Sequence, residues 1–265
     1  MMPADVWHTM KHDLLRGITE SVSSMFLFGL VIGSFLGTVV IRLPIGKTVI
    51  WGRSRCDHCG KALCLWQLIP VIGWIIQCGR CYFCNAQIPR LYLVMELGAA
   101  SVFLWSSATV PPTLVIPSTV LGLLLLTLGA MDWCYLVLSD LLVMPLLILG
   151  LLVSWLYWPE ILFDHVLGVV VGAMFLLAIN AFYRFFRHCD GLGMGDVKLL
   201  GAAGAWLGWS ALPSVLAIAS ASALLVVAGA RSFGVITNMK QKIAFGSYLC
   251  FSIWIVWLYG PIWWM

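Results

Sequence analysis

Four cysteines in a basic stretch of the chain have the spacing of a metal site. Cys56 and Cys59 form one C-x-x-C pair, and Cys81 and Cys84 form a second, with 21 residues between the pairs. Zn²⁺ binds four thiolates in a tetrahedron, and a loop too small for a hydrophobic core can depend on such an ion for its fold. The spacing predicts a structural zinc site, with disulfides or free buried thiols as the alternatives.

The same stretch contains further candidate ligands. Cys64 and Cys78 are interpreted as small apolar fillers, with a role as alternative ligands left open. His58 lies inside the first pair and is a weaker candidate than the cysteines. Four neighbouring basic residues favour the thiolate form of the cysteines near neutral pH: Arg53, Arg55, Lys61 and Arg80.

Carboxylates in or beside apolar runs are the second set of candidates. They are Glu96, Asp132, Asp140 and Asp196. Ionisable groups at membrane depth are costly, so each is a functional candidate. Asp132 ends one apolar run, and Asp196 ends a glycine-rich segment just before another. Two carboxylates within hydrogen-bond range hold one proton between them, so one can act as base and the other as acid. We expect this chemistry from Asp132 and Asp196.

Each carboxylate also has a purely structural interpretation. Asp140 and Asp196 could cap helix N-termini, and Glu96 could be a favourable charge near a helix start or pair with a nearby arginine. Lys198 is expected to anchor the cytoplasmic face or to contact an aspartate, because an amine there stays protonated and is no base.

Membrane helices must position these residues. The chain of 265 residues is 62% hydrophobic and 10% charged, with a mean hydropathy of +1.01, which excludes an ordinary soluble globule. The expected fold is an all-α polytopic membrane protein of about eight transmembrane helices, with a small cytoplasmic tetracysteine zinc-binding domain after the first. The spans are predicted near residues 25–43, 91–108, 114–131, 141–158, 164–183, 197–209, 211–230 and 244–264. Gly201, Gly204 and Gly208 predict close packing of the short span.

Basic residues predict the topology. Seven of the 15 Lys and Arg residues lie between Arg42 and Arg90, and none lies between Leu91 and Tyr183. By the positive-inside rule, residues 44–90 and the loops near 184–196 and 231–242 are cytoplasmic. Asp132 and Asp196 then lie near the cytoplasmic face. We expect three parts: residues 1–43 with the first span, the zinc-binding domain at 44–90, and a transmembrane domain at 91–265.

Taken in their order along the chain, the motifs resemble those of type IV prepilin peptidases, which are bacterial GxGD intramembrane aspartic endopeptidases. The resemblance runs from Gly33 to Gly246. It rests on Gly33-Ser34-Phe35-Leu36, Arg42-Leu43-Pro44, the cysteine pairs, Ile69-Pro70, Trp74, Gly79-Arg80-Cys81, Tyr92, Glu96, Asp132, Asp140, Gly193–Asp196, Lys198-Leu199-Leu200 and Ala244-Phe245-Gly246. The chain departs from the family pattern at Gly37, Asp57, Gln67, Leu68 and Ser139.

The resemblance implies an enzyme of the bacterial inner membrane, with Asp132 and Asp196 as its catalytic pair. It would cleave the leader of type IV prepilins or pseudopilins after a glycine at the cytoplasmic face, as a partner of pilus or type II secretion machinery. No nucleic-acid partner is expected.

Many members of this family also N-methylate the new N-terminus with S-adenosylmethionine, a function of the cytoplasmic region in which Glu96 could take part. The departures at Gly37, Gln67 and Leu68 bear on this second activity more than on proteolysis. No glycine-rich nucleotide loop marks a site for the cofactor.

Two other functions stay open. One is another GxGD membrane protease, presenilin-like or similar to signal peptide peptidase, although the tetracysteine segment argues against it. The other is an ion-coupled transporter or assembly scaffold. Coupling sites of transporters lie near mid-membrane, whereas both aspartates are expected near one interface.

Overall fold

Helices make up most of the part of the chain that the structure describes. The computed structural model describes residues 4–47, 49, 54–187, 193–232 and 243–262, with side chains of the first helix from Val22 onward. Within these ranges no strand forms, and two isolated antiparallel bridges pair Arg55 with Ala62 and Arg80 with Gln87. The predicted all-α class is confirmed. The predicted loops near 184–196 and 231–242 lie largely outside the described residues.

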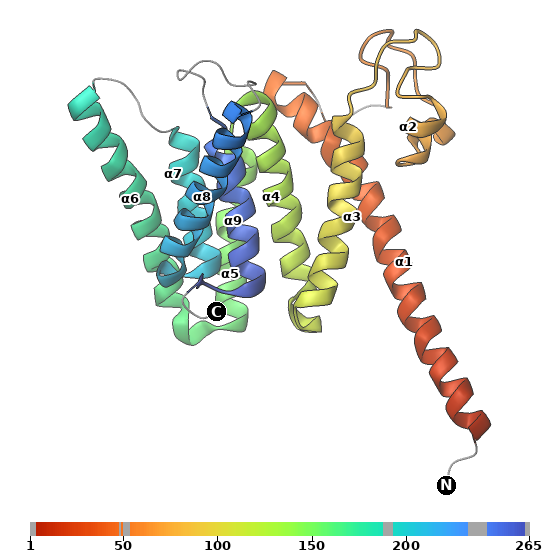
Figure 1. Cartoon of the computed structure of the whole chain (residues 1–265), viewed down its shortest axis with the longest axis horizontal. Coiled ribbons are helices and arrows are strands. Elements are labelled where there is room, and N and C mark those ends of the chain that lie inside the picture. Colours follow the sequence, from red (N-terminus) through yellow and green to blue (C-terminus); the bar gives the residue numbers. More distant parts are fainter. Residues whose placement is uncertain (1–3, 48, 50–53, 188–192, 233–242, 263–265) are drawn as a thin grey trace. The chain divides into compact units, whose positions relative to one another are not determined.

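Within the described ranges nine α-helices follow one another, joined in several places by short 3₁₀ turns (Figure 1). They are α1 (Ala4–Arg42), α2 (Ile72–Ile76), α3 (Leu91–Thr109), α4 (Val115–Tyr135), α5 (Asp140–Tyr157), α6 (Leu162–Arg187), α7 (Met194–Leu207), α8 (Leu212–Ser232) and α9 (Phe245–Tyr259).

Six segments of the described chain are long and apolar enough to cross a membrane: Val22–Ile45, Leu91–Thr109, Pro112–Tyr135, Asp140–Tyr157, Pro159–Phe186 and Trp209–Ser232. They coincide with six of the eight predicted spans. At the other two predicted spans, α7 and α9 are apolar but only 14 and 15 residues long. The protein is a multi-pass membrane protein.

The chain divides into two compact units. Unit 1 comprises residues 1–43 and 47–115, and unit 2 comprises residues 44–46 and 116–265. In unit 1, α1 packs on α3 through glycines spaced four residues apart. A Cβ added at Gly29 would lie 2.7 Å from the Ala100 Cα, and one at Gly33 would lie 2.5 Å from the Glu96 Cα. Small residues let helix backbones approach closely in lipid, so this spacing explains the contact.

Unit 2 contains α4 to α9 and is built around α7. The buried side chains of α7 include Leu199, Leu200 and Trp206. The predicted close packing is confirmed at Gly204, where an added Cβ would lie 2.2 Å from the carbonyl of Gly168 in α6. Gly208 differs from the prediction, because it follows the last residue of α7 with φ +76 and ends the helix. α7 is therefore held against its neighbours by backbone-to-backbone contact.

Candidate functional site

Asp132 and Asp196 come together at one end of unit 2. Asp132 lies in the last turn of α4, Asp196 lies in the first turn of α7, and both are buried. A Cβ added at Gly246, the second residue of α9, would lie 2.9 Å from Asp132 Oδ2 and 3.0 Å from Asp196 Oδ1. The two oxygens are therefore within about 6 Å of each other, the sum of those distances. A water molecule between them would be within hydrogen-bond reach of both carboxylates.

Asp132 is oriented by Ser247, a residue that sequence reasoning missed. The Ser247 backbone N–H donates a hydrogen bond to Asp132 Oδ2 at 2.8 Å. Its hydroxyl donates to the Gly129 carbonyl at 2.8 Å and lies 3.3 Å from the same aspartate oxygen. Ser247 directly follows the motif Ala244-Phe245-Gly246, and this adjacency was the available signal. Asp196 is not a helix cap, because Gly193 holds that position and the cap has no side-chain hydrogen bond.

The connection between α4 and α5 packs beside the aspartates. Leu136 has φ +54, and the chain then turns back so that Leu138 meets two glycines. A Cβ at Gly195 would lie 2.8 Å from the Leu138 Cβ, and one at Gly246 would lie 2.9 Å from the Leu138 Cδ1. The space that these glycines leave open is thus filled by Leu138, beside both carboxylates.

An ion pair fixes the other side of this connection. Lys198 Nζ contacts both oxygens of Asp140, at 2.7 and 2.8 Å, and ties the first turn of α7 to the first turn of α5. The expectation that Lys198 contacts an aspartate is confirmed. Asp140 is not the cap of α5, because Ser139 holds that position. The pair is half-exposed, so its contribution to stability is small, about 0–1 kcal/mol.

The four predicted cysteines form a compact cluster in unit 1. The sulfur atoms of Cys56, Cys59, Cys81 and Cys84 all lie within 4.8 Å of one another. Cys56 Sγ and Cys84 Sγ are 3.8 Å apart, far from a disulfide bond. A tetrahedron with metal–sulfur bonds of about 2.3 Å has edges of about 3.8 Å, so these side chains fit a zinc ion.

Both cysteine pairs are built as the same turn. Cys56 N donates to Lys61 O and Gly60 N to Cys56 O, while Cys81 N donates to Ala86 O and Asn85 N to Cys81 O. The residue after each pair has positive φ, +69 at Gly60 and +55 at Asn85, as glycine and asparagine tolerate best. Backbone N–H groups of Phe83 and Cys84 lower the pKa of the Cys81 thiol to about 7, which favours the ligating thiolate.

The remaining candidate ligands lie outside the cluster. Cys64 and Cys78 are exposed, so neither fills an apolar space inside the domain, and the interpretation as small apolar fillers is wrong. Cys78 has φ +48 and occupies a turn. His58 is exposed and is not among the clustered residues.

Comparison with known proteins covers both units. Residues 27–110 match the bacterial peptidase A24 N-terminal domain, and residues 119–228 match the type IV leader peptidase family. The chain is 34% identical over 252 residues to a prepilin leader peptidase/N-methyltransferase of Burkholderia pseudomallei (strain 1026b), which covers 85% of this chain and 79% of the relative. It is 33% identical over 267 residues to the protein of that name from Aeromonas hydrophila, at 90% of each chain.

The chain belongs to the type IV leader peptidase family. The predicted family and enzyme class are confirmed. No solved structure matches the chain.

Glu96 is neither a free helix-terminal charge nor, among the described residues, paired with arginine. Its Oε2 accepts a hydrogen bond from the Val71 backbone N–H at 2.7 Å, and the Ser34 hydroxyl contacts the same carboxylate. Val71 has φ +62 and ψ −55, and Ile72 N donates to Pro70 O at 2.6 Å. This is a γ-turn of the rare, strained kind. Glu96 therefore links α1, α3 and the cysteine-bearing segment.

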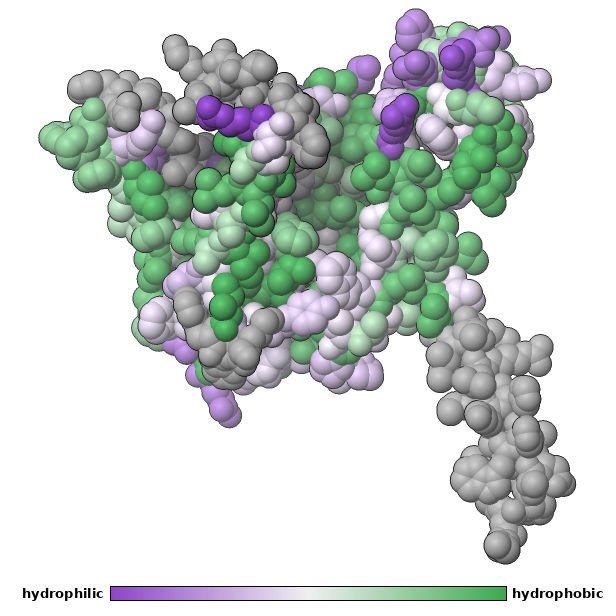
Figure 2. Space-filling model, viewed as in Figure 1, coloured by the Kyte–Doolittle hydropathy of each residue, from purple (hydrophilic) through white to green (hydrophobic). Residues whose placement is uncertain are grey.

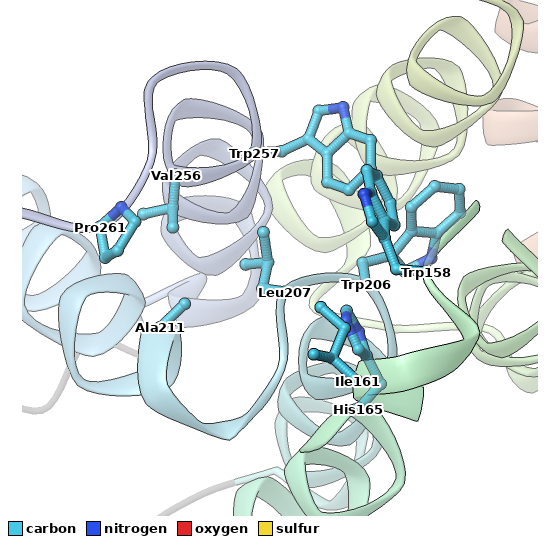
Figure 3. Close-up of a pocket in the computed structure, with 9 residues that line it drawn as sticks. All are labelled: Trp158, Ile161, His165, Trp206, Leu207, Ala211, Val256, Trp257 and Pro261. Carbon is cyan, nitrogen blue, oxygen red and sulfur yellow. The ribbon is translucent and has the colours of Figure 1, made fainter. Parts of the chain in front are cut away.

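A hollow of unit 2 lies away from the aspartates. It has a volume of about 240 Å³, and Figure 3 shows Trp158, Trp206 and Trp257 gathered on one side of it with His165 near Ile161. Trp206 is ten residues after Asp196 along α7, a separation of about 15 Å at the α-helical rise. His165 Nδ1 is engaged by Ser154 Oγ and the Ala205 carbonyl at 3.0 and 3.1 Å. The hollow is therefore no part of the aspartate site.

Proposed function

We propose that this protein is an aspartic endopeptidase of the bacterial inner membrane that removes the leader of type IV prepilins or pseudopilins. Asp132 and Asp196 are its catalytic pair, and cleavage follows a glycine at the cytoplasmic face. The observation that carries the proposal is the position of both carboxylates around Gly246, at 2.9 and 3.0 Å from its added Cβ. The relatives' names and the basic stretches near this end of the helices support the substrate and the orientation.

The chemistry follows from one shared proton. The ionised carboxylate takes a proton from water while the water oxygen bonds to the scissile carbonyl carbon. The protonated carboxylic acid then gives its proton to the departing amide nitrogen as the C–N bond breaks. The Ser247 N–H fixes Asp132 in one orientation, and burial excludes bulk water from the pair.

The cysteine cluster has a structural role in this proposal. Cys56, Cys59, Cys81 and Cys84 hold a zinc ion that fixes the two turns of the domain, whose sequence at 44–90 carries no large core. When bound, the ion supplies coordination bonds in place of buried apolar area.

A second activity is favoured by the relatives, whose names include an N-methyltransferase. We propose that methyl transfer to the new N-terminus uses S-adenosylmethionine. Glu96, the buried acid among the described residues of unit 1, is already engaged by Val71 and Ser34. No residue is therefore assigned to this cofactor, and no step is derived through it.

One experiment tests both activities. Purified full-length protein in detergent is incubated with a prepilin and S-adenosylmethionine, and leader loss and methyl addition are followed by mass. We expect Asp132→Asn and Asp196→Asn to abolish leader loss while Asp140→Asn, a matched neutralisation outside the pair, retains it. Normal processing by either pair variant would overturn the proposal. Proton- or cation-coupled uptake in vesicles that depends on either aspartate would favour the transporter instead.

A further inference from the structure

Residues 65–76 of unit 1 have an inverted polarity. Gln67 is the one polar side chain of this apolar segment, and it is buried. Its Oε1 accepts from Cys64 N at 2.8 Å, and its Nε2 lies 3.4 Å from Gln77 Oε1. Leu65, by contrast, is 86% exposed. In water a segment folds with its apolar side chains inward, so this arrangement points to an apolar surrounding.

The helix α2 shows the same inversion on one face. Ile72, Ile75 and Ile76 occupy positions i, i+3 and i+4, and they are 53, 58 and 63% exposed. The inward face of α2 is Gly73, where an added Cβ would lie 2.6 Å from the Gln67 carbonyl. The glycine brings the helix tightly onto its own domain, and more than half of each isoleucine side chain is left uncovered by the described residues.

The hydrogen bond of Glu96 gives the depth of this segment. Glu96 is five residues after Leu91, the first residue of the membrane-spanning helix α3, so its Cα is about 7.5 Å below the start of that helix. Val71 N donates directly to the Glu96 carboxylate at 2.7 Å. Helical side chains tilt toward the N-terminus, so the turn at Val71 lies about one helical turn below the first residue of α3. Interfacial helices bury their apolar face to a depth of about 5–10 Å.

Charged residues of the domain gather elsewhere. Arg55, Asp57, His58 and Lys61 belong to the first cysteine turn and are exposed. In Figure 2 the lobe of unit 1 that bears the cysteine turns is purple along its top and green along its lower outer side. The domain thus presents a hydrated face and an apolar face.

We propose that residues 65–76 are an interfacial membrane anchor, with the Ile72, Ile75 and Ile76 face of α2 inserted at the headgroup–acyl boundary of the bilayer. The occupant of this face is lipid, because the hydrogen bond to Glu96 holds the segment at that depth. The anchor fixes the zinc-binding domain flat against the membrane. This inference does not depend on the proposed peptidase activity.

Lipid proximity tests the anchor directly. A fluorescent non-natural amino acid is placed at Ile72, at Ile76 or, as the control on the hydrated face, at His58. Full-length protein is reconstituted in nanodiscs of phosphatidylethanolamine and phosphatidylglycerol, and lipids with a nitroxide near the headgroup act as quenchers. We expect quenching at Ile72 and Ile76 to exceed that at His58 several-fold. Zinc content per chain, unchanged from wild type, verifies that each labelled protein is folded.

Two outcomes would overturn the anchor. Equal quenching at Ile76 and His58 would mean that the face is in water. A fluorescence change at Ile76 only on addition of prepilin, with no quenching by lipid, would assign the face to substrate. Ile75→Ser combined with Ile76→Ser should reduce quenching at Ile72, whereas Ile75→Leu combined with Ile76→Leu should leave it unchanged.

Discussion

Replacing Gly246 by alanine tests whether the aspartates act as a closely spaced pair. Gly246 is the second residue of α9, where alanine is favoured over glycine by about 1 kcal/mol in intrinsic helix propensity. Folding should therefore tolerate the substitution unless the methyl group meets its neighbours. It does meet them, at 2.9 Å from Asp132 Oδ2 and from Leu138 Cδ1 and at 3.0 Å from Asp196 Oδ1.

The size of the effect follows from these distances. An ordinary contact begins near 3.4 Å, so each carboxylate oxygen must retreat by about 0.5 Å and their separation grows by up to about 1 Å. The methyl group also occupies space next to the water that both carboxylates must reach. Misplacement of a reacting group by about 1 Å costs about 10²-fold in rate, equivalent to about 2.7 kcal/mol in the barrier.

The assay compares kcat for leader removal in Gly246→Ala with that in Gly229→Ala. Gly229 lies in α8, and a Cβ there meets nothing within 4 Å, so this matched control should keep the wild-type rate. Thermal unfolding of both variants checks that they are folded. A wild-type kcat in folded Gly246→Ala would refute the claim that the two carboxylates must stay this close.

Three further predictions follow from the described contacts. Cys56→Ser should lose most of the zinc that metal analysis finds in the wild type, whereas Cys64→Ser, outside the cluster, should retain it; equal zinc in both variants would contradict the site. Ser247→Ala keeps the backbone donor to Asp132 and should lower kcat about fivefold, the effect of about 1 kcal/mol from one lost hydrogen bond; complete loss would mean that the hydroxyl itself reacts. Lys198→Met and Asp140→Asn should each change the free energy of unfolding by no more than about 1 kcal/mol. The charge-swapped double variant, Lys198→Asp with Asp140→Lys, should recover that change in low salt. A change of several kcal/mol would contradict an exposed pair.

Local spacing was sufficient to predict the cysteine cluster. Each C-x-x-C pair makes its own turn, and the turn needs only residues that follow within six positions, as in Cys56 to Lys61. The membrane helices were predictable for a similar reason, because a span is a continuous apolar run. The spans at α7 and α9 were predicted at nearly the observed positions, but their ends depend on glycines such as Gly208 and Gly260 that stop the helix.

The meeting of Asp132 and Asp196 required more than spacing. Their positions at the end of one apolar run and the start of another predicted a common membrane face, but not a contact. The contact depends on α9, since Gly246 supplies the opening between the carboxylates and Ser247 the donor. Nothing in the local sequence around either aspartate specifies which later helix will lie there.

Backbone donors explain why the partners of the buried acids were missed. Sequence reasoning sought a cation for Glu96, but a buried arginine would itself lose hydration and would add a second group needing partners. A peptide N–H left over at a turn or at a helix start already lacks an intrahelical acceptor, so its hydrogen bond to a carboxylate satisfies both groups. Val71 serves Glu96 in this way, and the Ser247 N–H, whose bond to the Ala244 carbonyl is long at 3.3 Å, makes its shorter bond of 2.8 Å to Asp132. Since every residue except proline carries the same N–H, residue type gives no signal for such a partner, and only the packing of helices far apart in sequence reveals it.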